Sequence, residues 1–285
     1  QRAVQAEDND PVTAAIWAIA ADREHGAAFL AGRAAEVFAL AAARSQAATV
    51  PLFLEEMENV AGAVAAARPT MAPLAAAGAR WLERLRRAGT ANIGEVRAQA
   101  QAAAGALKAQ MEEARRQAAA EAARVVRGAR YILTTSYSAT VAEALLEAHE
   151  AAAAGGELGV FIAAAGEHGE RLAAALRREG VAAEVFAVEE VEARARAADL
   201  ALVGADGLLP DGSVVNGVPT LALAQAAAAA GIPFYVVADS FKYAPGELIC
   251  EEGFERVPAA LVSGVISEKG VLPGQRTAKG GRMSC

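Results

Sequence analysis

The chain has 285 residues, enough for two domains or one large α/β unit whose core needs no disulfide or metal. Hydrophobic residues make up 54% but aromatic residues only 5%, so alanine supplies much of the apolar content, as is typical of helix-rich soluble proteins. The net charge of -7 gives no overall attraction for nucleic acid, but it leaves room for a local basic site for a small anion.

Membrane and metal signals are weak throughout the sequence. No segment of about 18 to 20 apolar, uncharged residues occurs, and the first residues lack the basic-then-apolar order of a signal peptide. The two cysteines, Cys250 and Cys285, fit neither a metal-binding spacing nor a disulfide framework. We therefore expect a cytoplasmic protein with no membrane or nucleic-acid partner, no metal and no cofactor.

Residues 1–128 are predicted to form an all-helical domain. Ala, Glu, Arg, Gln and Leu dominate from Pro11 onward, and breaks occur only at a few points. Those breaks are Pro51, Pro69, Pro73 and the segment 90–94. The segment Ile93–Arg127 is expected to be one long amphipathic helix, and we interpret its charge-rich face as a solvated surface.

Residues 129–273 are predicted to form a Rossmann-like domain, because short runs of strand-forming residues alternate there with helical segments. The runs are Tyr131–Thr134, Leu158–Ala163, Ala183–Ala187, Leu200–Gly204 and Phe234–Ala238. Strands joined by crossover helices run parallel, so the predicted fold class is α/β, with a helical domain followed by a parallel sheet that has helices on both faces. Residues 274–285 are expected to be a disordered tail.

Ligands of such sheets bind outside the carboxyl ends of the strands, so the residues after each strand are the candidates. After the first strand, Thr135, Ser136 and Ser138 form a hydroxyl-rich turn before an expected helix at Ala139–Glu150, whose N-terminus favours an anion such as phosphate. The alternative is that a serine of this turn only caps the helix. His168 follows the second strand, and a lone histidine is more often a surface residue than a catalytic one.

Asp206, directly after the fourth strand, is the strongest single candidate. A carboxylate there can act as general acid or base if burial raises its pKa, although such an Asp also commonly accepts hydrogen bonds from loop amides. A tight turn at Pro210–Gly212 follows, and Asn216 stands before a helix expected at Leu221–Ala230. After the fifth strand, Lys242 offers a cation at the same edge, where a lysine is otherwise usually solvated.

Five stretches together carry a family resemblance: Arg68–Thr70, Val203–Asn216, Thr220, Gly231–Ala238 and Ser240–Lys242. They resemble the alpha/beta/delta subunit family of initiation factor 2B, which includes ribose-1,5-bisphosphate isomerase and methylthioribose-1-phosphate isomerase. His25, Gly26 and Ala27 stand where the isomerases often have Arg-Gly-Ala. The resemblance covers roughly residues 20 to 273. It implies a helical N-terminal domain, a Rossmann-like C-terminal domain, and dimers that can assemble further.

The resemblance also implies that isomerases of this family use a cysteine just after the first strand, together with the Asp that corresponds to Asp206. Here Ser136 stands at the cysteine position, and a hydroxyl cannot be tuned to exchange a proton as a thiol with a pKa near 8.5 can. Ala163–Gly166 replaces a Glu-Ser/Thr-Arg-Pro segment and so removes an arginine expected near the ligand, while Gly217 stands where the family commonly has lysine. Arg68, Asp206, Asn216 and Lys242 persist.

Two hypotheses of different classes follow. The first is a non-catalytic protein that binds a sugar phosphate or a nucleoside monophosphate between the two domains. The second is an aldose-ketose isomerase acting on a phosphorylated pentose, with Asp206 as acid or base and Ser136 orienting a hydroxyl. The residues predicted to contact the ligand are His25, Gly26, Ala27, Arg68, Thr135, Ser138, Asn216 and Lys242.

We favour the first hypothesis, because paired catalytic groups act as a unit and the loss of one usually costs most of the rate. Dinucleotide-dependent oxidoreduction is poorly supported, since no G-x-G-x-x-G follows a strand with an acidic residue about 20 residues further on. A homodimer or larger homo-oligomer is expected, because the alanine-rich helix Leu221–Ala230 has few charges and would need a partner surface.

Overall fold

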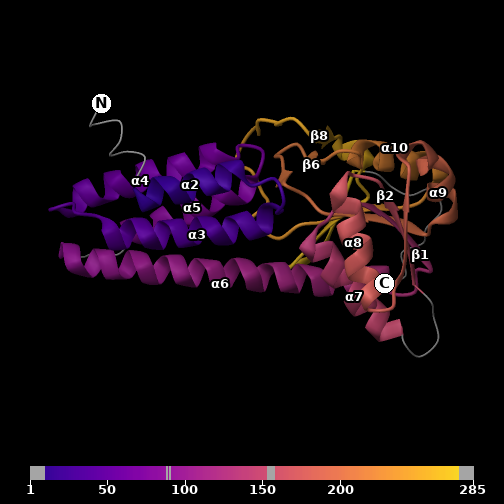
Figure 1. Ribbon diagram of the computed structural model, residues 1–285, viewed down its shortest axis with the longest axis horizontal. Coiled ribbons are helices and arrows are strands. Elements are labelled where there is room, and N and C mark those ends of the chain that lie inside the picture. Colours follow the sequence, from indigo (N-terminus) through magenta and orange to yellow (C-terminus); the bar gives the residue numbers. More distant parts are fainter. Residues whose placement is uncertain (1–9, 88, 90, 153–157, 276–285) are drawn as a thin grey trace. The chain divides into compact units, whose positions relative to one another are not determined.

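The computed structural model describes residues 10–87, 89, 91–152 and 158–275. The chain forms two compact units, one ending at Glu113 and the other beginning at Ala114, so the division falls inside the long helix α6 (Ile93–Val126) (Figure 1). The boundary expected from the sequence, at residue 128, lies just beyond the end of this helix. Among the described helices, none combines the length and the apolar character needed to cross a membrane.

The helical unit consists of the first part of α6 together with α2 (Pro11–Ala21), α3 (Ala27–Arg44), α4 (Val50–Ala67) and α5 (Ala72–Arg86). The Asp10 carboxylate accepts a hydrogen bond from the Thr13 N–H at 3.0 Å and thereby caps α2. Pro51 and Pro73 lie in the first turns of α4 and α5, where a missing N–H costs nothing. Two of the three prolines predicted as breaks therefore mark where helices begin, and Pro69 lies between α4 and α5.

A tryptophan centres the core of the helical unit. Trp81 is fully buried on α5, its ring stacks on Phe38 of α3 with centroids 4.7 Å apart, and its indole N–H donates to the Ala100 carbonyl of α6 at 2.9 Å. A Cβ added at Gly78 would lie 3.1 Å from the Ala61 Cβ, so small residues let α4 and α5 approach closely. The Ala-rich composition thus produces tight helix packing around one large aromatic side chain.

The α/β unit contains a seven-stranded sheet in the order β10-β9-β7-β4-β1-β2-β3. Its strands are β1 (Tyr131–Thr135), β2 (Gly159–Ala163), β3 (Ala182–Phe186), β4 (Leu200–Val203), β7 (Phe234–Val237), β9 (Gly264–Ser267) and β10 (Gly270–Pro273). All neighbours pair in parallel except β9 and β10. The five strands predicted from the sequence are present, each with ends within one residue of the prediction, and the predicted fold class is confirmed; β9 and β10 were not predicted.

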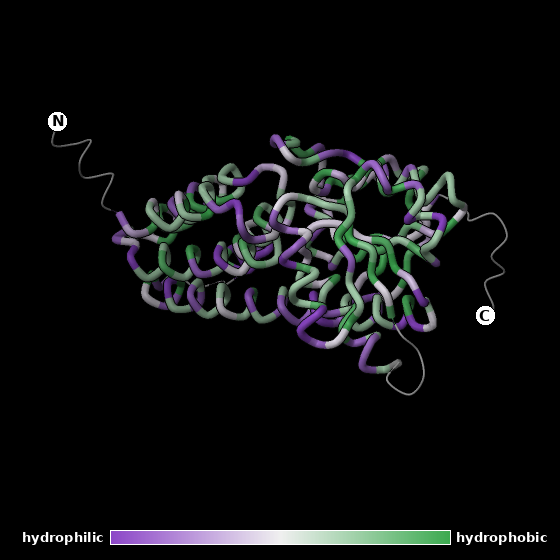
Figure 2. Tube along the Cα trace, turned by 45° about the vertical axis from the view of Figure 1, so that its right-hand side comes forward, coloured by the Kyte–Doolittle hydropathy of each residue, from purple (hydrophilic) through white to green (hydrophobic). Residues whose placement is uncertain are grey.

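Helices cover both faces of this sheet. On one face, Ile132 of β1 packs with the end of α6, with α7 (Ala139–Ala152) and with α8 (Glu167–Arg178). On the other, Leu133 packs with α9 (Val191–Ala197) and α10 (Thr220–Ala230). Because successive strand residues point to opposite faces, a parallel sheet covered on both sides needs apolar residues at every position. Figure 2 shows hydrophobic residues, in green, gathered along these strands.

A second, three-stranded antiparallel sheet, which the sequence did not predict, has the order β5-β6-β8. Its strands are β5 (Gly207–Leu208), β6 (Val214–Gly217) and β8 (Phe254–Val257), and the short 3-10 helices are η1 (Val188–Glu190) and η2 (Ala259–Leu261). The small sheet shares its core with α9 and α10. Of the predicted tail, Gly274 donates its N–H to the Ser263 carbonyl at 2.9 Å, and residues 276–285 lie outside the described residues.

Candidate ligand-binding site

The strand order creates a switch point between β1 and β4. From β1 the chain continues to β2 and β3 on one side, then crosses to β4 on the other, so the turns after β1 and β4 diverge. Ligands of open α/β sheets bind in the crevice at such a point. The two turns touch: a Cβ added at Gly204, after β4, would lie 2.8 Å from the Ser138 Oγ and 3.1 Å from its Cβ. Glycine at position 204 therefore lets the hydroxyl turn approach.

Ser136, at the centre of the hydroxyl turn, has a φ of 57°, the one positive value among the non-glycine residues described. A left-handed backbone at such a residue costs about 1 to 3 kcal/mol and is typical of functional turns. The neighbouring hydroxyls hold the turn. Thr135 donates to the Ala163 carbonyl at 3.1 Å, and the Ser138 Oγ accepts from the Val141 N–H at 3.4 Å. Ser138 thus caps α7, the alternative considered above, and its contact with a ligand stays a prediction.

Asp206 and Lys242 lie at the same edge of the α/β unit. The Asp206 N–H donates to the Val215 carbonyl of β6 at 2.8 Å, and two residues later the Leu208 N–H donates to the Lys242 carbonyl at 2.8 Å. The Asp206 turn is therefore held between the small sheet and the loop after β7. Lys242 is only 7% exposed, although a lysine at this edge was expected to be solvated unless it served a ligand.

Two carboxylates that the sequence analysis did not propose as site residues contact the loop that carries Lys242. Asp239, after β7, is 5% exposed and accepts the Phe241 N–H at 2.9 Å, while Glu268, after β9, accepts the Ser240 N–H at 3.1 Å. Burial raises the pKa of Asp239; the attraction of Lys242 opposes that rise, and the Glu268 carboxylate adds to it. An acidic residue directly after a predicted buried strand was the signal that could have identified Asp239.

Asn216 has a structural partner. It lies on β6, nearly buried, and donates its side-chain amide to the Thr220 hydroxyl at 2.9 Å, which in turn donates to the Gly217 carbonyl at 2.6 Å. These bonds hold the start of α10. A Cβ added at Gly217 would meet nothing closer than the Gly253 carbonyl oxygen at 3.8 Å, so the site could accommodate the lysine that the resemblance implies.

The predicted residues of the helical unit gather around Asp22. The Asp22 carboxylate accepts the His25 N–H at 2.9 Å and lies 2.8 Å from the ring Nδ1, while Arg68, 3% exposed, donates to the Asp22 carbonyl at 2.5 Å. Burial acts to raise the pKa of Asp22, but the hydrogen bonds from His25 and Glu24 hold it below its ordinary value. Gly26, which directly precedes α3, meets nothing within 4 Å of an added Cβ. The N-terminus of α3 has no side-chain cap, and such a helix end favours an anion.

The predicted residues thus form two clusters. The helical cluster contains His25, Gly26, Ala27 and Arg68, and the strand-end cluster contains Thr135, Ser136, Ser138, Asp206, Asn216 and Lys242. In the described residues, no group of three or more His, Cys, Asp or Glu side chains could hold a metal ion. Cys250 is a free, exposed thiol.

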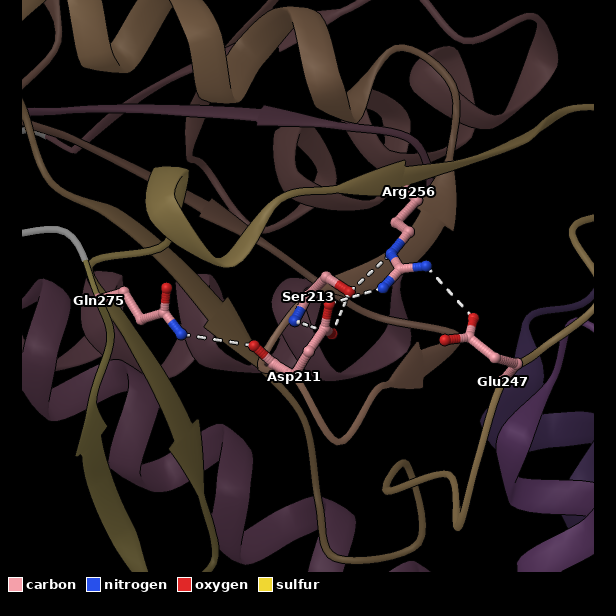
Figure 3. A network of polar contacts seen from close by, with 5 residues as sticks. All are labelled: Asp211, Ser213, Glu247, Arg256 and Gln275. Carbon is pink, nitrogen blue, oxygen red and sulfur yellow. Dashed lines mark hydrogen bonds and ion pairs between the residues drawn. The ribbon is translucent and has the colours of Figure 1, made fainter.

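An arginine supports the small sheet that carries Asn216 (Figure 3). Arg256 of β8 donates to the Ser213 Oγ at 2.8 Å and to the Asp211 carboxylate at 2.6 Å, and it pairs with Glu247 at 3.2 Å. The hydrogen bonds from Ser213, and then the Arg256 guanidinium, lower the pKa of Asp211 to about 2. The network ties the predicted turn at 210–212 to β8.

A helical unit followed by a parallel sheet with a polar switch point defines a Rossmann-like α/β protein. The chain belongs to the initiation factor 2 subunit family, whose profile matches residues 23–252. A protein of Pyrococcus horikoshii described as "Putative translation initiation factor eIF-2B subunit 2-like" is 32% identical over 181 residues, which are 57% of this chain and 64% of that protein. The match therefore spans less than two thirds of that relative.

An isomerase is also among the relatives. A methylthioribose-1-phosphate isomerase of Synechococcus sp. is 34% identical over 103 residues, which are 26% of this chain and 31% of that enzyme. Among solved structures, the translation initiation factor eIF-2B of Pyrococcus horikoshii has a TM-score of 0.80 at 26% identity, with 93% of this chain and 97% of that chain covered. These findings confirm the family resemblance inferred from the sequence.

Proposed function

We propose that this chain binds a small phosphorylated molecule, a sugar phosphate or a nucleoside monophosphate, at the strand-end cluster, without the Cys/Asp isomerase chemistry of some relatives. The observation that carries the proposal is the burial of Lys242 in the loop after β7, the strand that neighbours β4. Burying an ammonium group is costly unless a counter-charge stabilises it. The counter-charge already present, Asp239, is itself penalised by burial, as its raised pKa shows.

A phosphate at this edge would add negative charge beside Lys242. The N-terminus of α7, a helix from Ala139 to Ala152, adds the N–H groups and the dipole that favour anions. Ser136, left-handed and half-buried at this turn, adds a hydroxyl that can donate to a phosphate oxygen. The Lys242 ammonium, the N-terminus of α7 and the Ser136 hydroxyl therefore all favour the binding of an anion.

The Ser136 hydroxyl also supports the non-catalytic part of the proposal. A serine becomes a nucleophile or a proton carrier only beside a base that shares its proton. In the described part of the chain, no histidine or carboxylate makes a hydrogen bond to Ser136. The cysteine of the related isomerases would not need such help to the same degree, because its pKa is much closer to neutral.

Isothermal titration calorimetry with ribose 5-phosphate and with AMP tests the proposal. We expect the wild type to bind at least one of these probes and Lys242→Gln to bind it at least tenfold more weakly, as for a lost charged hydrogen bond. Lys269→Gln, which removes an exposed lysine after β9, is the matched control and should bind within twofold of the wild type. A wild type that binds neither probe, or an unchanged affinity in Lys242→Gln, would contradict the proposal.

The helical cluster is proposed to contribute through Arg68. Its guanidinium is buried and is oriented by the Asp22 carbonyl, a geometry that suits phosphate recognition. Arg68→Ala should weaken binding of the same probe in the same calorimetric titration. An unchanged affinity would remove the helical cluster from the ligand site and leave the strand-end cluster as the binding site.

An isomerase is the second candidate, because one relative that matches 26% of this chain is methylthioribose-1-phosphate isomerase. In that case Asp206 would act as acid or base on a phosphorylated pentose. The test is conversion of ribose 1,5-bisphosphate to ribulose 1,5-bisphosphate. Substantial turnover by the wild type that is lost in Asp206→Asn would replace the binding proposal, whereas activity gained only in Ser136→Cys would support a chain that lost its chemistry at this one position.

Association of chains is also proposed. The first reason given for it is weakened by the structure, because α10 already packs against α9, β4 and β8 of its own chain. Support comes instead from β10, an edge strand with Val271 and Leu272 exposed, since such an edge can pair with another chain. Light scattering at micromolar concentration should report a homodimer or a larger assembly, and a monomer would refute the proposal.

A further inference from the structure

The side of the hydroxyl turn that faces β2 carries no charge of its own. The loop between β2 and α8 consists of Ala164, Ala165 and Gly166, which have no polar side chain. A ligand phosphate near Ser136 would therefore find no cation in the nearest loop. Any positive charge on this side of the switch point has to come from a helix.

Arg171, on the second turn of α8, brings such a charge to the hydroxyl turn. Its guanidinium carbon lies 4.3 Å from the centroid of the Tyr137 ring. Tyr137 stands between Ser136 and Ser138, and its ring packs against the core cluster on the α7 and α8 face of the sheet. A cation over an aromatic face is held by the ring's electrons, so Tyr137 fixes the guanidinium beside the turn although the Arg171 residue is exposed.

A second observation at this turn is an unsatisfied hydroxyl. Thr134 is fully buried at the end of β1, and its Oγ1 has no hydrogen-bond partner among the described residues. Because side chains alternate along a strand, Thr134 shares the face of Ile132, which is the face where Tyr137 packs. Buried polar atoms nearly always have a partner, so this hydroxyl is a polar group that a water molecule or a ligand atom could satisfy.

We propose that Arg171, held against Tyr137, is a ligand-binding residue that contacts a phosphate group at the Ser136 turn. The inference rests on the proposed function and adds to it a cation from α8 on the β2 side of the turn, where the loop supplies none. Guanidinium groups bind phosphate oxygens with two parallel hydrogen bonds, and a ring that holds the group in place reduces the entropy lost on binding. Arg171 would thus approach the ligand from the β2 side, while Lys242 approaches it from the β7 side.

Calorimetry on the full chain tests the inference with ribose 5-phosphate and AMP as probes. Arg171→Gln should bind the better probe at least tenfold more weakly than the wild type. Arg178→Gln is the matched control, because it removes the same charge from the last turn of α8, and its affinity should stay within twofold. Arg171→Lys keeps the charge without the planar fork and should lie between the wild type and Arg171→Gln.

Tyr137 provides a separate readout of the stacking. Tyr137→Phe keeps the ring and should bind within about threefold of the wild type, whereas Tyr137→Leu removes it and should lose part of the affinity that Arg171→Gln loses. In the double variant Tyr137→Leu/Arg171→Gln the two losses should not add, because both remove one guanidinium contact.

The outcomes separate this inference from the proposed function. If the wild type binds and Lys242→Gln weakens binding while Arg171→Gln does not, the role of Arg171 is refuted and the binding proposal stands. If the wild type binds neither probe, both fall. If Arg171→Gln loses affinity but also melts well below the wild type, Arg171→Lys decides. A stable Arg171→Lys protein whose affinity lies between those of the wild type and Arg171→Gln supports the fork geometry, and an affinity equal to the wild type refutes it.

Discussion

The two sheets of the α/β unit differ in how strongly their sequences define them. Every inner strand of the seven-stranded sheet is flanked on both sides and covered by helices on both faces. The small sheet β5-β6-β8 has one strand of only two residues and shares a single core with α9 and α10. The large sheet is held by burial of continuous apolar strands, and the small one depends also on local polar contacts such as those of Arg256.

This difference separates two kinds of site residue. The candidates Ser136, Asp206 and Lys242 follow strands of the large sheet, and the backbones of Asp206 and Lys242 also bond to strands of the small sheet. Asn216 lies on the small sheet, and its amide is already engaged by Thr220. A rigid scaffold with variable strand-end turns is the common basis of ligand sites in α/β proteins. The predictions below test this contrast between the two sheets.

The largest expected effect is on the free energy of unfolding, and it is measured by comparing one leucine from each sheet. Leu133 of β1 and Leu208 of β5 are both buried in the same core cluster. Leu133→Ala should cost about 4 kcal/mol of unfolding free energy, because the central strand cannot collapse around the cavity, while Leu208→Ala should cost about 2 kcal/mol, because a short strand can relax. Urea unfolding followed by circular dichroism measures both. Equal costs would show that the two sheets are equally rigid.

The next largest effect on stability is expected where the turns after β1 and β4 meet. A Cβ at position 204 would overlap the Ser138 side chain, so Gly204→Ala should cost about 1 to 2 kcal/mol and disturb the switch point. Ser138→Gly removes the overlapping atoms, and the double variant Gly204→Ala/Ser138→Gly should therefore lose less stability than the two single changes summed. Additive losses would mean that the turns do not meet in solution.

The elements of the large sheet could be predicted because burial on both faces leaves a periodic signal. Continuous runs such as Phe234–Val237 have few alternatives to a buried strand. The strands β5 and β8 could not be predicted, since Gly207–Leu208 has only two residues and Phe254–Val257 has two adjacent charged residues, Glu255 and Arg256, in its centre. Their pairing depends on partners distant in sequence, which a single sequence does not reveal.

The candidate residues that the sequence analysis proposed are those whose preceding strands could be predicted. Asp206 and Lys242 are candidates of this kind, whereas Glu268 follows β9, which was not predicted. The contact of Arg171 with Tyr137 could not be predicted for another reason, because an exposed arginine on a helix does not differ in sequence from other exposed arginines. Contacts between side chains from different elements carry no local sequence signal.

A smaller effect concerns two adjacent threonines of β1. The Thr134 hydroxyl has no hydrogen-bond partner within the described parts of the chain, while the Thr135 hydroxyl donates to the Ala163 carbonyl. Thr134→Val removes a buried unsatisfied group and should stabilise the protein by about 1 kcal/mol, and Thr135→Val should destabilise it by a similar amount. Thermal unfolding without ligand measures both. A destabilised Thr134→Val would indicate that ordered water satisfies this hydroxyl.

The smallest effect lies at the surface of the small sheet, where Asp211 has a pKa lowered to about 2. Because the carboxyl is a stronger acid in the folded than in the unfolded chain, its contribution to stability is present above pH 4 and is lost as the pH falls toward 2. The contribution is small, since exposed ion pairs are screened by water. Hydrogen bonds from Ser213 lower this pKa most, so Ser213→Ala should raise it more than Arg256→Gln does. Titration of the Asp211 carboxyl by nuclear magnetic resonance measures both shifts. A larger shift in Arg256→Gln would mean that the guanidinium, and not the Asp211–Ser213 turn, holds the carboxylate in its charged form.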